Sequence, residues 1–419
     1  LMCGAKVTGG TKARLPNKMH SLIERISVEA GGLTIAQGFS GFNTVSHVKS
    51  ILSDSPCKTQ SLEASMNHED IPRTFSSVNN AAVDAGEDYS SETTFAIGNF
   101  VGFLGESSPS IIDTALLPNM VLKIHLATDA VCSSSVDIGL YDNANGASTG
   151  FGVSGSGTPK YTLNKVHLLA SVYGIMDGNY DRMIEQKILT EGMLEIPFKN
   201  YQTFTDGQHS GSTRFNLGCQ SLDRLYAAFR PADYASGGLH PSIMSGMKQK
   251  PATAGLHGYS SGVTDGGSFG SPVDIAKTVG VAPFESPHFN GEKYQANYFR
   301  FPKPSGLATS QFNINGSLYP QFQAEPADWL ALTSDAMGQV PNGIKCKAWW
   351  DNNMHVYAVR LNLPDSDKLR ILSGLDTRAV NLSGMFTTTG ISGTVPVTVI
   401  AEYTSTLRVG AGLQLSLVV

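Results

Sequence analysis

The sequence has little charge, and the charge it has is not clustered. Charged residues make up only 16% of the 419 residues, the net charge is −5, and lysines and arginines never form a run of four. Nucleic-acid-binding domains usually carry a concentrated basic patch. We therefore expect no direct sequence-specific nucleic-acid binding. Low charge is also typical of surfaces buried between subunits, because charged residues are depleted at interface centres.

Cysteines are few and do not fall into any ligand or redox spacing. Their number is odd, which predicts reduced thiols rather than a disulfide framework. The cysteines are Cys3, Cys57, Cys132, Cys219 and Cys346. The ten histidines include no pair four residues apart, so no helical metal-ligand pair exists. We expect neither a metal site nor a cofactor.

Long apolar runs are also missing. No stretch of about eighteen apolar residues occurs, which predicts that no helix spans a membrane. The first twenty residues lack the continuous apolar segment of a secretory signal. The sequence does not bear on contact with a membrane surface.

Glycine and short alternating runs are abundant. There are 44 glycines, and segments such as residues 121–127 alternate between apolar and polar side chains, which is typical of half-buried strands. Amphipathic stretches do not exceed about a dozen residues, which argues against an architecture of alternating strands and crossover helices. The sequence therefore predicts an all-β protein with long loops and a few short helices. Two packed sheets, as in a sandwich or jelly roll, would bury one face of each strand.

One β module occurs twice along the chain. Residues 26–35 read as a strand, a glycine turn and a second strand, and the helix-like stretch 45–52 follows. Residues 311–319 read in the same way and are followed by a helix-like stretch at 326–337. Neither copy carries a repeated catalytic group. A duplicated fold without duplicated chemistry favours a building block over an enzyme.

The two modules are also expected to close alike. Residues 212–217 lead into an apolar stretch at 219–229, and residues 395–400 lead into 402–419. We expect the following division: an N-terminal arm at 1–20, a first jelly roll at 21–230, connecting loops at 231–293, and a second jelly roll at 294–419.

The connecting segment is rich in glycine, serine and proline and shows no period over about sixty residues, which is typical of a functional loop or linker. It also contains aromatic side chains that are too apolar for free solvent in every copy. We expect this segment on a surface, with part of it against a neighbouring subunit. The assembly candidates are Tyr234, Tyr259, Phe269, Phe284 and Phe289.

Two glycine motifs look chemical but lack their structural context. Gly150–Gly155 matches the dinucleotide fingerprint G-x-G-x-x-G, yet a Gly- and Pro-containing stretch follows it where a helix is required. Gly266–Gly270 matches the nucleophile elbow G-x-S-x-G, yet no strand precedes it. We interpret both as loops and expect no catalytic residue.

The pair Trp349 and Trp350 leaves a binding protein open as an alternative. Adjacent tryptophans can form a sugar platform, which would suit a two-domain β-sandwich lectin or fibre. More commonly, one ring of such a pair lies in the core and the other on the opposite face. A β-rich hydrolase is a third class, because carboxylates distant in sequence can converge in space.

Several short sequence blocks follow one another along the chain. They contain Gly102, Phe103, Leu104, Pro109, Asp113, Thr114, Leu117 and Pro118 in the first block, Ser221, Leu222, Asp223 and Arg224 in the second, and Gly374, Asp376 and Arg378 in the third. Residues 312–316 look like the opening of the second module. In this order, and over roughly residues 21–419, the blocks resemble the major capsid proteins of polinton-like viruses and their virophage relatives.

This resemblance implies two eight-stranded jelly rolls in tandem, that is, a double jelly roll. It implies a structural protein of the virion rather than an enzyme. Three copies would form a pseudo-hexameric capsomer that tiles an icosahedral shell around double-stranded DNA. The implied partners are further copies of the chain and, beyond them, penton and minor capsid proteins. Synthesis would occur in the host cytoplasm or nucleus.

The two glycine motifs can be tested directly. We expect Ser268→Ala and Gly152→Ala to leave assembly unchanged, because neither motif has the strand and helix that its chemistry requires. Gel filtration of the two variants beside the unmodified chain checks this. A hydrolase or nucleotide-binding activity that either substitution abolishes would contradict it.

Overall fold

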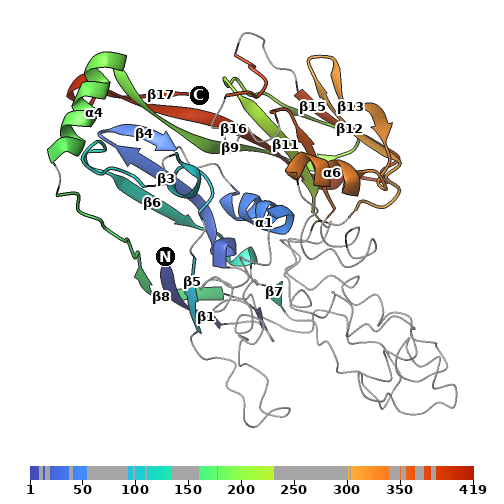
Figure 1. Ribbon diagram of the computed structural model, residues 1–419. Coiled ribbons are helices and arrows are strands. Elements are labelled where there is room, and N and C mark those ends of the chain that lie inside the picture. The colour runs from blue at the N-terminus through green and yellow to red at the C-terminus, as the bar shows by residue number, and fades with distance from the viewer. Residues whose placement is uncertain are drawn as a thin grey trace.

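The computed structural model describes sixteen stretches of the chain. They are residues 1–8, 13–14, 19–36, 41–53, 93–97, 100–108, 111–131, 133–134, 160–176, 178–230, 301, 303–338, 350, 355–363, 372–378 and 384–419. The connecting segment 231–293 and both glycine motifs lie outside these residues. Within them the expected all-β class with a few short helices is confirmed (Figure 1).

Strands dominate the described residues. They are β1 (Met2–Thr8), β2 (Ala13–Arg14), β3 (Ile23–Ala30), β4 (Leu33–Ala36), β5 (Thr93–Ala96), β6 (Val121–Leu126), β7 (Ser133–Ser134), β8 (Lys160–His167), β9 (Met193–His209), β10 (Ser212–Phe215), β11 (Leu222–Phe229), β12 (Thr309–Ile314), β13 (Ser317–Ala324), β14 (Val356–Arg360), β15 (Gly384–Thr389), β16 (Val395–Gly410) and β17 (Leu415–Val418). The α-helices are α1 (Phe42–Ser53), α3 (Phe103–Glu106), α4 (Gly178–Glu191) and α6 (Trp329–Met337), and 3-10 turns are η1 (Met19–Leu22), η5 (Asp129–Val131) and η13 (Ala411–Leu413).

Both expected module openings are confirmed. β3 and β4 are joined by two glycines whose φ angles are +56° and +81°, and β12 and β13 are joined by Asn315 and Gly316 with φ of +51° and +85°. Two-residue turns with positive φ at both positions match the right-handed twist of a hairpin, and Asn-Gly and Gly-Gly favour them. The expected short helices follow as α1 and α6.

The long strands β9 and β16 form the central pair of the fold. They are 17 and 16 residues long and pair antiparallel from Met193 opposite Gly410 to His209 opposite Val395. The other edge of β16 pairs first with β11 and then with β17. Both edges of β16 are therefore filled along most of its length, and Figure 1 shows the pair running across the molecule.

Two sandwiches share this central sheet. Near one end of the pair, Ile196, Phe198, Leu407 and Val409 pack against the inner face of the β4–β3–β6 sheet. Toward the other end, β11, β14 and the first half of β16 pack against the sheet ordered β10–β15–β12–β13. Two packed β-sandwiches in one chain are the arrangement expected of a tandem jelly-roll protein.

The expected boundary at residue 230 does not separate these sheets. Strands β10 and β11, which the sequence division placed in the first unit, pair with β15, β14 and β16 of the second. Phe215, Leu225 and Phe229 also lie in the same core as Phe312 and Phe386. The sheets change ahead of residue 212, because the apolar faces of β10 and β11 match strands that come much later in the chain.

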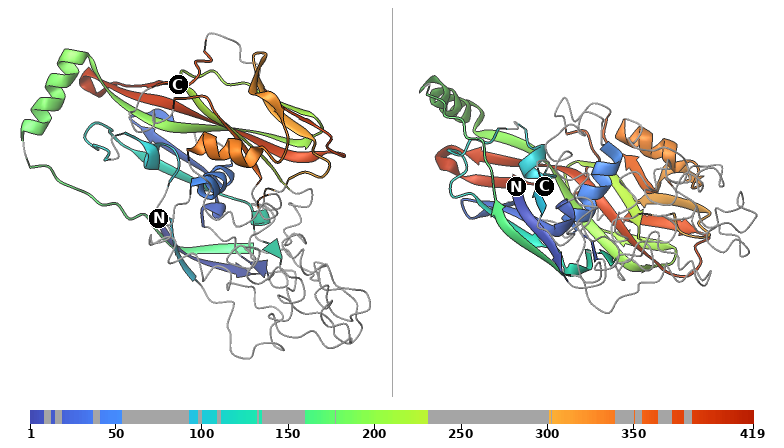
Figure 2. Two further views of the ribbon diagram at one scale, coloured as in Figure 1. Left: turned by 45° about the vertical axis from the view of Figure 1, so that its right-hand side comes forward. Right: turned by 90° about the horizontal axis from the view of Figure 1, so that it is seen from below.

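Two smaller expectations also need correction. Residues 2–8 are not an arm without structure but the strand β1, which pairs with β5 and β8 (Figure 2). The second closing begins with one long strand, β16, and ends in β17, where the first closing is two short strands, β10 and β11. The run from Val397 to Val409 contains neither glycine nor proline, so nothing interrupts it.

The core of the second sandwich is built around aromatic rings. Phe386 lies 4.8 Å from Phe312, 5.4 Å from Tyr357 and 5.9 Å from Phe229, measured between ring centroids. All four side chains are fully buried. Offset and edge-on ring pairs at such distances stabilise a core beyond the burial of their area.

We expect Phe386→Ala to lower the free energy of unfolding by about 3–5 kcal/mol, because it leaves a cavity that these three neighbouring rings cannot fill. Urea denaturation measures this change. Phe322→Ala is the matched control, since the Phe322 side chain is 52% exposed on β13. Equal losses in both variants would contradict the proposed packing.

Candidate functional site

Two of the blocks that carry the capsid resemblance meet in space. Leu222 and Leu375 exchange two backbone hydrogen bonds of 2.9 Å. The Gly374 amide donates to Ser221 Oγ at 2.9 Å, and that hydroxyl donates to Asp223 Oδ1 at 2.8 Å. The second and third blocks, about 150 residues apart, thus form one contact at the start of β11.

Position 374 requires glycine because this contact leaves no room for a Cβ atom. A Cβ atom there would lie 2.5 Å from the Leu222 carbonyl oxygen and 2.6 Å from Asp223 Oδ1. Backbone and a hydrogen-bonded carboxylate cannot give way cheaply. A side chain at position 374 would therefore separate the two blocks.

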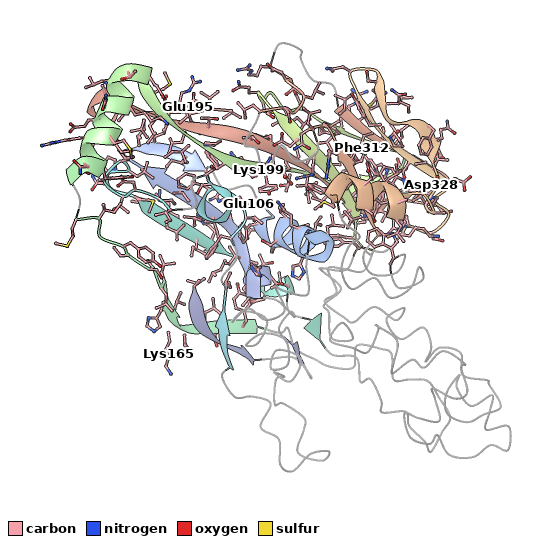
Figure 3. All side chains as sticks on the ribbon, viewed as in Figure 1. Glu106, Lys165, Glu195, Lys199, Phe312 and Asp328 are labelled. Atoms are coloured by element: carbon pink, nitrogen blue, oxygen red, sulfur yellow. The ribbon has the colours of Figure 1, made fainter. Side chains whose placement is uncertain are left out.

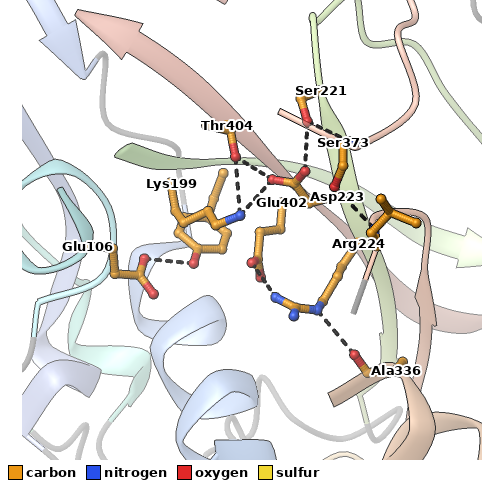
Figure 4. A network of polar contacts seen from close by, with 12 residues as sticks. Glu106, Lys199, Ser221, Asp223, Arg224, Ala336, Ser373, Glu402 and Thr404 are labelled. Atoms are coloured by element: carbon orange, nitrogen blue, oxygen red, sulfur yellow. Dashed lines mark hydrogen bonds and ion pairs between the residues drawn. The ribbon is translucent and has the colours of Figure 1, made fainter. Parts of the chain in front are cut away.

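Asp223 anchors one half of a buried polar network (Figure 4). Lys199 Nζ, on β9, donates to Asp223 Oδ2 at 2.8 Å and to Thr404 Oγ1 at 3.1 Å. Thr404, on β16, donates to the same Asp223 oxygen at 2.6 Å. The network therefore ties together three adjacent strands, β9, β16 and β11.

Glu402 is the centre of the other half. Its two oxygens accept hydrogen bonds of 2.8 Å from Arg224 Nη1 and 2.6 Å from the Tyr226 hydroxyl. Arg224 Nε also donates to the Ala336 carbonyl at the end of α6 at 3.2 Å. Lys49 Nζ lies 3.5 Å from Glu402 Oε2, which brings α1 into the network.

Lys49 continues the network to α3. It donates to Glu106 Oε1 at 2.7 Å and also contacts the Tyr201 hydroxyl, which donates to Glu106 Oε2 at 2.7 Å. The Gly102 amide donates to the same Glu106 oxygen at 2.8 Å, and so the first resemblance block is joined to the other two. Figure 3 shows Glu106 and Lys199 near the middle of the molecule.

The network is balanced in charge and well buried. Three cations, Lys49, Lys199 and Arg224, face three carboxylates. The side chains of Glu402 and Asp223 are 1% and 2% exposed. Charges this deep are tolerated only when they are paired and hydrogen-bonded. Each helix or strand of the network supplies a hydrogen-bond or ion-pair partner to another one. The network therefore fixes the relative positions of α1, α3, β9, β11, β16 and α6.

Glu402 stays ionised despite its burial. Burial alone would raise the pKa of its carboxyl, but the charges of Lys49, Arg224 and Lys199 and the Tyr226 hydrogen bond outweigh it and hold that pKa at about 2. Burial and the nearby carboxylates Glu106 and Glu402 raise the pKa of Tyr201 well above its usual value. The site therefore contains fixed ion pairs and neutral phenols, a combination suited to structural locking.

The rest of the first block positions the chain around β9. Gly102, with φ of +88°, precedes α3, and Phe103 is buried edge-on against Phe198 with centroids 5.1 Å apart. Leu104 packs half-buried beside it. Gly102 needs its glycine because positive φ strains other residues.

The end of the first block supports the β3–β4 hairpin. Pro118 accepts a 2.7 Å hydrogen bond from the Gly31 amide, and Leu117 is buried in the same core as β3. Asp113 Oδ1 accepts from the Ala115 amide at 2.9 Å, and its Oδ2 accepts from the Tyr180 hydroxyl at 3.1 Å. The carbonyl of Thr114 accepts from the Leu117 amide at 3.4 Å.

Other candidate residues lie apart from the network. Asp376 and Arg378 form an exposed ion pair of 2.7 Å. Pro109 and the assembly candidates Tyr234, Tyr259, Phe269, Phe284 and Phe289 lie outside the described residues. Trp350 is buried at 1% exposure, so its ring is not available as a sugar platform.

Sequence reasoning missed Glu402, Lys199, Lys49 and Glu106. One signal for Glu402 was present, since it is the only charged residue between Val395 and Leu407 in an apolar strand. A charge in such a strand usually has a buried partner. Which partner it has depends on pairing between distant segments. Within the described residues, no cluster of three or more metal-ligating side chains occurs and no helix is long and apolar enough to cross a membrane.

We expect Glu402→Gln to lower the free energy of unfolding by about 3–5 kcal/mol, because Arg224 and Lys49 lose their buried counter-charge. The folded-state pKa of Glu402 is below its ordinary value of 4.5, so the stability it confers is present above that pH and is lost as the pH falls toward about 2. Urea denaturation at pH 7 and pH 3 should show a smaller difference between wild type and variant at pH 3.

Asp376→Asn is the control for this substitution. It removes the carboxylate of an exposed ion pair, which solvent screens, so we expect a much smaller loss of stability than for Glu402→Gln. A Glu402→Gln variant as stable as Asp376→Asn at pH 7 would show that the network does not hold the two sandwiches together.

No protein-family model and no curated protein matches this sequence. Among solved structures, VP54 of PBCV-1, as fitted into a cryo-EM reconstruction of the virophage Sputnik, is similar over 99% of this chain and 88% of its own, with 13% identity and a TM-score of 0.49. The Faustovirus major capsid protein matches over 95% and 73%, with 9% identity and a TM-score of 0.46. The mavirus major capsid protein matches over 99% and 82%, with 8% identity and a TM-score of 0.39.

Proposed function

We propose that this chain is a major capsid protein, the repeating structural unit of an icosahedral shell around double-stranded DNA. The observation that carries the proposal is the convergence of the three resemblance blocks on one buried network. Five residues of the sequence blocks take part in this buried network or border it. They are Gly102, Ser221, Asp223, Arg224 and Gly374. The blocks therefore mark one structural feature of the fold.

The architecture suits a load-bearing role. β9 and β16 pass through both sandwiches, so the sandwiches cannot rotate against each other without breaking a continuous ladder. The buried ion pairs add a second restraint at the same junction. A shell subunit needs this stiffness because its function is to hold its neighbours at fixed angles.

Three finer points belong to the same proposal. The capsomer is a homotrimer in which six jelly rolls give a pseudo-hexagonal outline. Its further partners are neighbouring capsomers, with penton and minor capsid proteins at the remaining positions of the shell. The chain acts in the virion after synthesis in the host cytoplasm or nucleus, and it carries out no catalysis.

The alternative is a two-domain β-sandwich protein that binds glycans. Its sequence support was the tryptophan pair, and the burial of Trp350 removes half of that platform. Trp349 lies outside the described residues. The capsid proposal is therefore favoured by the structure's own contacts.

Native mass spectrometry tests the proposal. We expect a species of three times the 44.6 kDa chain mass at low micromolar concentration, because interfaces of standard size or larger form stable complexes. Negative-stain images should show a pseudo-hexagonal outline. A stable monomer that binds a glycan array would support the lectin instead.

A further inference from the structure

The segment between β8 and α4 is extended, apolar and exposed. Six of its large side chains have exposed fractions between 58% and 103%. They are Leu168, Leu169, Val172, Tyr173, Ile175 and Met176. No strand among the described residues pairs with 168–176, and α4, which follows, has no buried side chain. Figures 1 and 2 show the segment standing away from the sandwiches.

The exposed apolar area is large enough for a stable interface. At about 100 Å² of apolar surface for each fully exposed side chain, the six together present roughly 450 Å². A standard interface buries about 800 Å² on each partner, a little over half of it apolar. An area of this size matches the largest apolar patch of a typical monomer, and such patches often mark a binding surface.

A second surface on the same chain, the open edge of β6, is suited to receive an extended apolar segment. β6 is the last strand of the β4–β3–β6 sheet, and its outer edge has no partner among the described strands. Val121 and Leu126 on β6 are 45% and 52% exposed. An open edge offers unpaired backbone donors and acceptors to an extended segment.

We propose that residues 168–176 of one copy dock along the open edge of β6 of a second copy. The inference rests on the proposed self-assembly and names the surfaces that carry it. The segment supplies extended backbone and apolar side chains, and the edge supplies unpaired backbone and an apolar rim. In Figures 1 and 2 the segment lies apart from β6 of its own chain, which leaves that edge to a neighbour.

Two different surfaces meeting head to tail have a consequence for symmetry. A contact of one patch with itself gives a closed dimer, whereas a contact between two distinct patches closes into a ring when the rotation allows it. Each copy then donates one segment and receives another. The geometry thus favours a cyclic assembly, such as a trimer, over a two-fold dimer.

Complementation between two variants tests the proposal. The segment variant carries Val172→Glu and Met176→Glu, and the edge variant carries Leu126→Glu. Each alone should be monomeric, with association weakened by roughly 100-fold, because a charge is placed in the centre of the contact. An equimolar mixture keeps one intact segment and one intact edge. It should therefore form a heterodimer of twice the chain mass and no ring in native mass spectrometry.

Leu363→Glu is the matched control, since Leu363 is a 64% exposed leucine on another part of the chain, and we expect it to assemble like wild type. Circular dichroism confirms that each variant is folded. Hydrogen exchange on the wild type should show amides 168–176 protected in the assembly and unprotected after dilution to monomer.

The outcomes separate this inference from the proposed function. A wild-type chain that never assembles contradicts the capsid proposal and the docking with it. A wild-type assembly that either variant still forms, or a mixture without heterodimer, overturns the docking alone. Protection of 168–176 in the monomer would show that the chain covers its own segment, and that also overturns it.

Discussion

The pairing of β9 with β16 is the constraint from which the rest of the structure follows. A buried strand must satisfy its backbone donors and acceptors, and β16 does so with β9 along one edge and with β11 and then β17 along the other. Once this register is set, alternate side chains of β16 are assigned to faces. Val397 and Val399 enter one core, and Leu407 and Val409 enter the other. The two sandwiches are thus built on common strands.

The buried charges lie where the helices α1 and α6 pack on the strands β11 and β16. A β ladder fixes register well, but it does not fix how helices pack on its outer face. Lys49 on α1 and the Ala336 carbonyl on α6 are both held by partners on β11 and β16. Buried ion pairs often contribute little net stability because of their desolvation cost. Their value here is that a wrong placement of α1 or α6 would leave a charge buried without its partner.

The chain combines two well-packed cores with one segment, between β8 and α4, whose apolar side chains are exposed. Apolar side chains of β3, β9, β11 and β16 fill the two cores, while those of the β8–α4 segment belong to neither core and are largely exposed. Covering the apolar side chains of this segment would remove their surface from water. The place of these side chains in the fold therefore supports the proposed self-assembly.

By itself the sequence determined the features that depend on neighbours in the chain. Gly31–Gly32 and Asn315–Gly316 specify tight hairpins because glycine and asparagine accept positive φ, and alternation over residues 121–127 specifies a strand. Only the tertiary structure decided that residues 2–8 pair with β5 and β8, that β10 and β11 join the later sheets, and that Glu402 meets Arg224 and Lys49. Local turns are set by backbone sterics within a few residues. Strand partners separated by as many as two hundred residues or more are chosen by the fit of whole apolar faces, which no short stretch of sequence contains.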